Sequence, residues 1–271
     1  MAAAAAAIGI AGSASAATIA LDGGGVNTVG GTTIEGLNVG NTRTYTSGSV
    51  TLVAQGWTYD TDYTPDKLVA SYLGAYSGNG LGVSSPHVDA NGSTSGNGYG
   101  GAVETSSGNQ HTVDNNCDGR IDFILLKFST AVDLTSLYFK VFDVPPTGGA
   151  DGDATVFYKN GAFAPSNGGN AETYLAQFTS IDLPGNTNGS RNVLGLTYSD
   201  TWLVAAAANS SFNDGFKLKS LEYTLRPPGV PEPATWLFMI MGFGGAGAML
   251  RRRRRLAPLA SSAIEPGFDL L

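Results

Sequence analysis

The densest group of side chains able to bind a metal ion lies between residues 114 and 122, in the run Asp-Asn-Asn-Cys-Asp-Gly-Arg-Ile-Asp. As a calcium-binding loop, this run has side-chain oxygens at positions 1, 3, 5 and 9, which are Asp114, Asn116, Asp118 and Asp122. Ca²⁺ takes six to eight oxygen ligands, and this spacing supplies several of them. Position 12 is Leu125 where a bidentate glutamate is expected, and no helix is predicted on either side.

The same run is also typical of a turn rich in Asp and Asn that leads into a strand, with its side chains bonded to nearby backbone amides. Both interpretations of residues 114–122 stay open. Asp151 and Asp153 are candidates for a second acidic loop. Calcium is therefore the one cofactor that the sequence suggests, and otherwise none is expected.

Catalysis has little support in the sequence, and no catalytic residue is assigned. His87 and His111 are the only histidines, and neither an H-E-x-x-H nor a G-x-S-x-G motif occurs. A pair of carboxylates for glycoside hydrolysis leaves no sequence signature, because the fold sets their separation. A secreted polysaccharide-active hydrolase therefore stays as an alternative to a non-catalytic protein. Trp57, Tyr59 and Tyr63 are candidates for stacking on sugar rings, or else for the core.

The composition favours strands over helices. The 271 residues include 38 glycines, while the charged residues are only 14% of the chain. The formal net charge of −7 argues against a partner that is a nucleic acid. Cys117 is the single cysteine, so an internal disulfide is excluded and the core must hold the fold together.

Alternating apolar residues predict a fold of many short strands. Ile124, Leu126 and Phe128 face one side of a strand, and Phe123, Leu125 and Lys127 face the other. Similar segments occur at residues 32–39, 43–46, 50–59, 134–143, 154–158, 173–183, 192–198, 201–207 and 216–225. Strands at this spacing without long amphipathic helices predict an all-β fold, a single jelly-roll-like β-sandwich over residues 17–229. Within it, residues 78–110 are rich in Gly, Ser and Asn and predict a surface loop.

One row of threonines favours a further alternative. Thr42, Thr44 and Thr46 recur with a period of two and would share one face of a strand. Ice-binding surfaces use threonine rows of this kind on many stacked strands, whereas this chain has a single row. A calcium-stabilised adhesion module or an ice-binding-like module is the alternative that these features support.

Residues 1–16 predict a secretory signal peptide. An alanine-rich apolar run ends in Ala14-Ser15-Ala16, which has small residues where signal peptidase cuts. Ala14 and Ala16 are therefore the predicted cleavage residues, and signal peptidase is an expected partner. The mature protein is then expected to begin at Ala17.

The C-terminal region predicts a single transmembrane helix. Residues 234–250 carry no charged side chain and are followed by five arginines. As a helix these 17 residues would reach about 25 Å, and Trp236 and the arginines suit the two membrane interfaces. The arginines are expected to stay in the cytoplasm, and residues 256–271 are expected to form a disordered cytoplasmic tail.

The order of these parts resembles the PEP-CTERM sorting signal of Gram-negative bacteria, in its tryptophan-containing variant. The resemblance covers residues 230–255 and is carried by Pro231, Glu232, Pro233, Trp236, Arg251, Arg252, Arg253, Arg254 and Arg255. It implies processing near the Pro-Glu-Pro by exosortase, a membrane protease or transpeptidase. The protein would then stay only transiently in the inner membrane and pass into the cell envelope or the extracellular matrix.

A second resemblance concerns the region before the sorting signal. The run His-Thr-Val-Asp-Asn at residues 111–115, with residues 122–129, 151–156 and 201–206, resembles a group of exosortase-dependent surface proteins. The resemblance implies no catalytic activity and no site residues. The function expected from the sequence is therefore that of a non-catalytic surface or extracellular-matrix protein, associated with the exopolysaccharide of the bacterium that makes it.

Overall fold

The structure is a computed structural model that describes residues 16–23, 26–29, 32–34, 41–61, 63–84, 111–115, 120–143, 150–162, 164–193, 195, 197–207, 214–226 and 233–256. The chain divides into two compact units. One unit comprises residues 14–226, and the other comprises residues 1–13 and 227–271. Of the predicted segments, the signal peptide up to residue 15, the loop over residues 85–110 and the tail from residue 257 lie outside the described residues.

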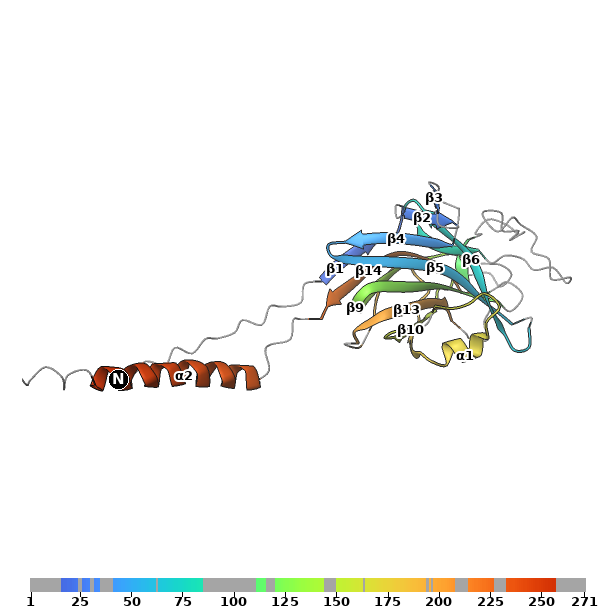
Figure 1. Cartoon of the computed structure of the whole chain (residues 1–271). Helices are drawn as coiled ribbons and strands as arrows, with labels where there is room; N and C mark the ends of the chain where they lie inside the picture. Colours follow the sequence, from blue (N-terminus) through green and yellow to red (C-terminus); the bar gives the residue numbers. More distant parts are fainter. Residues whose placement is uncertain are drawn as a thin grey trace, which may run out of the picture. The chain divides into compact units, whose positions relative to one another are not determined.

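The first unit is built almost entirely from strands (Figure 1). In chain order its elements are β1 Ala16–Ala20, β2 Val26–Val29, β3 Thr32–Ile34, β4 Thr42–Ser47, β5 Val50–Asp60, β6 Lys67–Tyr76, β7 Gly80–Ser84, β8 Val113–Asp114, β9 Ile121–Val141, β10 Ala154–Lys159, α1 Ala171–Leu175, β11 Thr179–Leu183, β12 Gly189–Asn192, β13 Ser199–Ala206 and β14 Gly215–Leu225. The prediction of an all-β fold is therefore confirmed for this unit.

The centre of the unit is a closed barrel of five strands, with the other strands outside it. Neighbouring strands in the barrel pair in the order β9-β14-β7-β6-β5, and β5 pairs with β9 to close the ring. The closing contact runs from Leu52 opposite Phe128 to Tyr59 opposite Ile121. The predicted sandwich of two separate sheets is not confirmed, because hydrogen bonds join all 14 described strands into one sheet.

The long strand β9 makes this closure possible. Its first half pairs with β5 and β13, and its second half pairs with β14 and β12. Register shifts in the pairing with β14 mark bulges, which bend a strand and increase its twist. Two predicted strands over residues 121–128 and 134–143 are thus one continuous strand.

The main core fills the barrel. Residues from all five barrel strands contribute to one buried cluster, among them Leu52, Leu73, Val83, Ile124 and Leu218. A second buried cluster lies on the other face of β9 and contains Phe123 and Leu125 together with Trp57, Leu203 and Tyr174. The predicted alternation along residues 123–128 is confirmed, and both faces of this strand are buried.

A short helix covers the second cluster where the sequence pattern predicts a strand. α1 begins after Asn170, whose side-chain oxygen accepts a hydrogen bond from the Thr173 amide at 2.6 Å. Such a cap supplies a partner for a backbone donor that the first turn of a helix leaves free. Ala171 and Tyr174 face the protein interior, so the predicted strand over residues 173–183 is limited to β11.

One further local prediction is corrected by the structure, and another is in agreement with it. The predicted surface loop over residues 78–110 begins with a strand, because β7 runs from Gly80 to Ser84 and pairs with β6. Gly82 allows this close packing, since a Cβ atom there would lie 1.6 Å from the carbonyl oxygen of His111. Thr42, Thr44 and Thr46 share the less buried face of β4, and this row is confined to that one strand.

The second unit contains the helix α2, Pro233–Leu256. The predicted helix over residues 234–250 is therefore present, and it continues through the arginines. Within the part of the chain that the structure describes, no helix combines the length and the apolar character needed to cross a membrane. The prediction of a transmembrane helix is therefore not confirmed.

Candidate functional site

The described residues of the predicted calcium loop do not lie together on one loop. Asp114 ends β8 and accepts a hydrogen bond from the hydroxyl of Thr112 at 2.5 Å. Asp122 lies on the next strand, β9, eight positions after Asp114 in the sequence. Asn116 and Asp118 lie outside the described residues, so the predicted ligand set as a whole is not tested.

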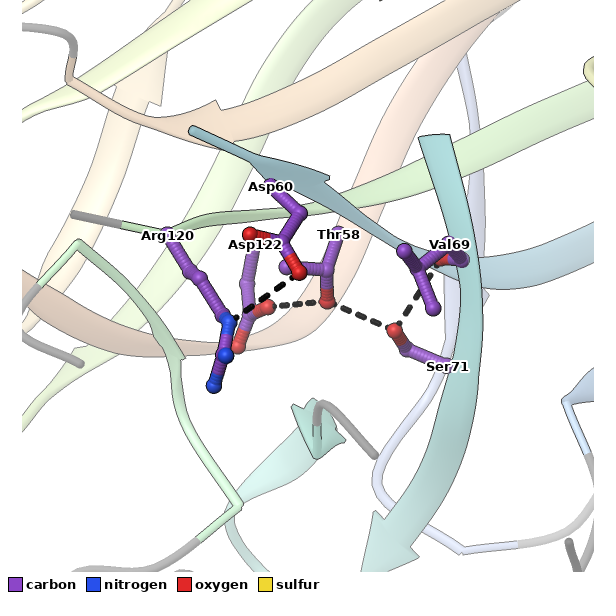
Figure 2. Close-up of polar contacts among 6 residues, drawn as sticks. All are labelled: Thr58, Asp60, Val69, Ser71, Arg120 and Asp122. Carbon is purple, nitrogen blue, oxygen red and sulfur yellow. Dashed lines mark hydrogen bonds and ion pairs between the residues drawn. The ribbon is translucent and has the colours of Figure 1, made fainter. Parts of the chain in front are cut away.

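Asp122 belongs to a buried polar network between β5, β6 and β9 (Figure 2). Its Oδ1 accepts a hydrogen bond from Thr58 Oγ1 at 2.6 Å, and Thr58 Oγ1 lies 2.6 Å from Ser71 Oγ. Beside it, Arg120 Nε donates to Asp60 Oδ2 at 3.3 Å, and the side chains of this ion pair are only 5% and 2% exposed. These contacts indicate a structural role for Asp122.

A different group of carboxylates is brought together at one end of the strands. Asp151, Asp153 and Asp214 each offer a carboxylate oxygen, and these oxygens lie within 4.8 Å of one another. Asp151 and Asp153 precede β10, and Asp214 directly precedes β14. A parallel bridge joins Asp151 to Asp214, and the Gly215 amide donates to the Asp151 carbonyl at 2.8 Å. Backbone pairing therefore fixes the spacing of the cluster.

Hydrogen bonds orient the three carboxylates. Asn115 Nδ2 donates to Asp214 Oδ2 at 2.7 Å, and Asn115 Oδ1 accepts from the Asp214 amide at 3.1 Å. The Gly152 amide donates to Asp151 Oδ1 at 2.8 Å, and the Gly185 amide donates to Asp153 Oδ1 at 2.5 Å. Each carboxylate is thus held through one of its two oxygens.

Burial and mutual repulsion disfavour the charged form of Asp214. This residue is 0% exposed, and burial together with the charges of Asp151 and Asp153 raises its pKa to about 7. Hydrogen bonds from Asn115 and from the Asp153 backbone act in the opposite direction. The cluster therefore contains a carboxylate whose negative charge lacks compensation.

Arg191 is a cation that lies beside this cluster. Its guanidinium donates to three backbone carbonyls, those of Gly152 at 2.5 Å, Leu183 at 3.1 Å and Gly185 at 2.6 Å. Burial lowers its pKa, while the charges of Asp153, Asp151 and Asp214 favour its charged form. Arg191 thus ties together the segments that carry the cluster.

Sequence reasoning found part of this cluster and missed the rest. The Asp-Gly-Asp run at residues 151–153 was identifiable as an acidic loop, because two carboxylates stand two residues apart. Asp214 belongs to an Asn-Asp-Gly run that predicts only a turn, and nothing in the sequence connects it to Asn115. A hydrogen bond between residues 99 positions apart leaves no pattern in the local sequence from which it could be predicted.

A groove of about 630 Å³ lies over the second buried cluster. Its apolar part includes Phe123, Leu203 and Ala205, and its polar residues include Thr155, Ser180, Asp182 and Glu172. Tyr59 and Phe157 line it as half-buried aromatic side chains. Asp153 also lines the groove, so one member of the acidic cluster borders it.

The aromatic residues that the sequence suggested for sugar binding have different environments. Tyr59 lines the groove, and its hydroxyl donates to Asp66 Oδ2. Burial and this hydrogen bond raise the pKa of Tyr59, so its hydroxyl stays protonated. Trp57 is only 6% exposed and belongs to the second cluster, while the ring of Tyr63 lies under Lys67 Nζ at 4.0 Å. Only Tyr59 of the three is placed to contact a ligand in this groove.

Of the two histidines, His111 is among the described residues, and its ring contacts Ser84. His111 Nδ1 shares a hydrogen bond with Ser84 Oγ, and its ring stacks on Tyr76 with 5.7 Å between the centroids. Burial and the positive charge of Lys217 lower the pKa of His111, so its ring is neutral near pH 7. Ser84 is only 3% exposed.

The residues of the predicted processing sites lie outside the described residues or at the ends of described elements. Ala14 is outside it, and Ala16 is the first residue of β1, where it pairs with Thr224. Pro231 and Glu232 are also outside, whereas Pro233 is the first residue of α2. Trp236 and the five arginines at residues 251–255 lie within α2.

Comparison with known proteins identifies the C-terminal segment and no other part of the chain. No curated protein and no solved structure matches the sequence. A family model described as the PEP-CTERM protein-sorting motif matches residues 229–255, the segment that contains α2 and its arginines. The resemblance of residues 230–255 to the PEP-CTERM sorting signal is thereby confirmed. The chain carries a PEP-CTERM protein-sorting motif, an exosortase-dependent signal for export and for membrane-associated sorting to the cell envelope.

Proposed function

We propose that this is a non-catalytic protein of the bacterial surface or extracellular matrix whose β-barrel unit binds a neutral exopolysaccharide. Exosortase would cleave the chain near Pro231 and Glu232 and release the barrel unit from the membrane. The observation that supports the binding activity is the groove that Tyr59 and Phe157 line above the second buried cluster.

The lining of the groove suits a sugar chain. Aromatic side chains present a flat apolar face, and a polysaccharide presents C–H groups that pack against such a face. Thr155 and Ser180 supply hydroxyls, and the exposed carboxylates of Asp182 and Glu172 accept hydrogen bonds from sugar hydroxyls. An apolar groove with a few convergent polar groups is the usual form of a small-ligand site.

The charge of the groove favours a neutral polymer over an acidic one. Asp153, Glu172 and Asp182 all line it, and the whole chain has a net charge of −7. Like charges on the protein and the polymer repel each other and slow their association. We therefore expect acidic polysaccharides to bind less tightly than neutral ones.

The same carboxylates support a second candidate function, a polysaccharide hydrolase. Glycoside hydrolysis uses two carboxylates about 5–10 Å apart, one of them a general acid. Glu172 and Asp182 are the candidate pair, because both are exposed carboxylates of the groove lining that lie outside the acidic cluster. Asp182 Oδ1 accepts a hydrogen bond from Thr155 Oγ1 at 3.0 Å.

The test is affinity electrophoresis of the full chain in gels that contain neutral or acidic polysaccharides. Phe157→Ala should weaken binding of a neutral polymer about tenfold, which corresponds to about 1.4 kcal/mol. Phe178→Ala is the matched control, because Phe178 is another half-buried aromatic residue packed against the second cluster and does not line the groove. Equal binding by both variants, or no retardation of the wild type in any gel, contradicts the proposal.

The hydrolase candidate is tested with the same polymers. Reducing ends are measured after incubation with the wild type and with Glu172→Gln and Asp182→Asn. Release of reducing ends by the wild type, and its loss in either variant, would favour the enzyme over the binding protein. Binding without release supports the proposal.

A further inference from the structure

The acidic cluster contains a buried oxygen atom for which the described residues offer no partner. Asp214 Oδ1 accepts no hydrogen bond from any residue that the structure describes, and the residue is 0% exposed. A buried charged group without a partner costs several kcal/mol, and native proteins rarely retain one without a reason. The carboxylate oxygens of Asp151 and Asp153 lie within 4.8 Å of the Asp214 carboxylate.

We propose that Asp151, Asp153 and Asp214 bind one calcium ion, which the unpartnered Asp214 Oδ1 contacts directly. The ion would join the segment before β10 to the segment before β14. The site differs from the loop that the sequence suggested, because none of its three carboxylates belongs to residues 114–122. It rests on the geometry of the cluster and does not depend on the proposed glycan binding.

The hydrogen bonds around the cluster leave the required oxygens available. Asn115 holds Asp214 through Oδ2, which directs Oδ1 to the ion. Backbone amides hold Asp151 and Asp153 through Oδ1, so Oδ2 of each is the remaining ligand. Partners of this kind orient metal ligands and raise the affinity of a site.

The donor atoms favour calcium over transition metals. All three ligands are carboxylates, which suit hard cations such as Ca²⁺ and Mg²⁺, and among the described residues neither a histidine nor a thiolate joins the cluster. Ca²⁺ accepts irregular arrangements of six to eight oxygens, while Mg²⁺ needs nearly ideal octahedral geometry. Three chain carboxylates with water to complete the shell therefore fit Ca²⁺ better.

The electrostatics of the cluster agree with a divalent cation. Three carboxylates meet one nearby guanidinium, and Arg191 donates to backbone carbonyls of Gly152, Leu183 and Gly185. The excess of negative charge is therefore not neutralised by a direct ion pair. An ion of charge +2 would remove the repulsion between the carboxylates.

The location after export agrees with a weak site. Calcium sites of extracellular modules have Kd values of about 10⁻⁴–10⁻³ M, which suits a protein that works outside the cytoplasm. The sorting motif directs this chain to the cell envelope. The cation would then stabilise the barrel only after export.

The experiment measures the melting temperature of the full chain in EDTA and in rising CaCl₂. At a calcium concentration 100 times Kd, a bound ion should raise the Tm of a unit of this size by about 5–10 °C. Equilibrium dialysis with ⁴⁵Ca²⁺ should give about one ion per chain. MgCl₂ is the second arm, and an equal rise with Mg²⁺ would overturn the assignment to calcium.

The variant Asp214→Asn gives a result that a purely structural role would not produce. Removal of the buried charge should raise the Tm in EDTA and abolish the shift with calcium. Asp151→Asn, at a half-buried position, should also abolish the shift and serves if Asp214→Asn does not fold. Glu222→Gln removes one exposed carboxylate elsewhere on β14 and should keep the full response.

Asp118→Asn separates this site from the loop suggested by the sequence. It should keep the calcium response if the ion binds at Asp214. Loss of the response in Asp118→Asn with retention in Asp214→Asn would overturn the proposal and favour the loop. A wild-type Tm that is the same in EDTA and in 10 mM CaCl₂ would overturn a calcium site of either kind.

Discussion

Asn115 Nδ2 donates a hydrogen bond to Asp214 Oδ2 at 2.7 Å, although 99 positions separate the two residues in the sequence. The same amide group donates to the Ala207 carbonyl at 2.8 Å. One side chain after β8 thus holds the ends of β13 and β14 together. It also donates a hydrogen bond to Asp214, the carboxylate whose charged form burial and the charges of Asp151 and Asp153 disfavour.

Replacement of Asn115 should therefore destabilise the barrel unit. Asn115→Ala removes the donor to a buried carboxylate, and the free energy of unfolding should fall by about 1.5–3 kcal/mol. Urea unfolding in EDTA measures the change without a contribution from calcium. Asn186→Ala, at an exposed position, should stay within about 0.5 kcal/mol of the wild type. Equal stability of the two variants would show that the Asn115 contact has no net effect.

The buried ion pair of Asp60 and Arg120 leads to a second prediction. Asp60→Ala leaves the guanidinium of Arg120 in buried surroundings without this partner, so unfolding should become easier by about 3–5 kcal/mol. The double variant with Arg120→Ala should cost less than the sum of the single variants. A double-mutant cycle in urea measures this coupling, and additive effects would argue against an energetic role for the pair (Figure 2).

The stability of the barrel unit should fall when His111 is protonated. Burial and Lys217 lower the folded-state pKa of His111 below its usual 6.5, so the unfolded chain binds the proton more tightly. The stabilisation is complete above about pH 6.5 and is lost as the pH falls from there toward the lower folded-state pKa.

His111→Asn tests this pH dependence. Asn tolerates the left-handed backbone conformation of this residue, which has a φ of 74°. Unfolding in urea between pH 7.5 and 5 should show a smaller loss of stability in the variant than in the wild type. Parallel curves would assign the acid sensitivity to other groups.

The sorting motif predicts the fate of the chain. A Pro-Glu-Pro sequence is unfavourable for helix extension, because proline fixes φ and lacks an amide donor, and this property suits a cleavage signal. Simultaneous change of Pro231, Glu232 and Pro233 to Ala should leave a full-length protein in the inner-membrane fraction. The wild type should lose α2 and its arginines, which mass spectrometry of the fractions detects. Full-length protein in both cases would show that the motif does not direct processing.

Removal of the signal peptide is predicted for the same mature protein. N-terminal sequencing should begin near Ala17, which would leave residues 17–20 to pair with β14. Recovery of an envelope protein that still begins with Met1 would contradict the predicted cleavage after Ala16.

Local patterns in the sequence predicted the features that depend on neighbouring residues. The alternation over residues 123–128 identified a strand, because side chains on a strand point to opposite faces in turn. The sorting motif was also readable, since its Pro-Glu-Pro, its uncharged segment and its arginines follow one another along the chain. The all-β class followed from the strands and turns in the same way.

Only the tertiary structure decided how distant segments meet. The sequence could not show that β5 pairs with β9 to close a barrel, because strand pairing depends on all the strands together. The sequence suggested calcium for one contiguous run, whereas the site that we propose combines carboxylates from residues 151, 153 and 214, the last of which Asn115 holds. A calcium site on one loop has a fixed spacing that can be read from the sequence. Side chains from the ends of separate strands have no fixed spacing, and the pairing of those strands alone brings them within reach of one ion.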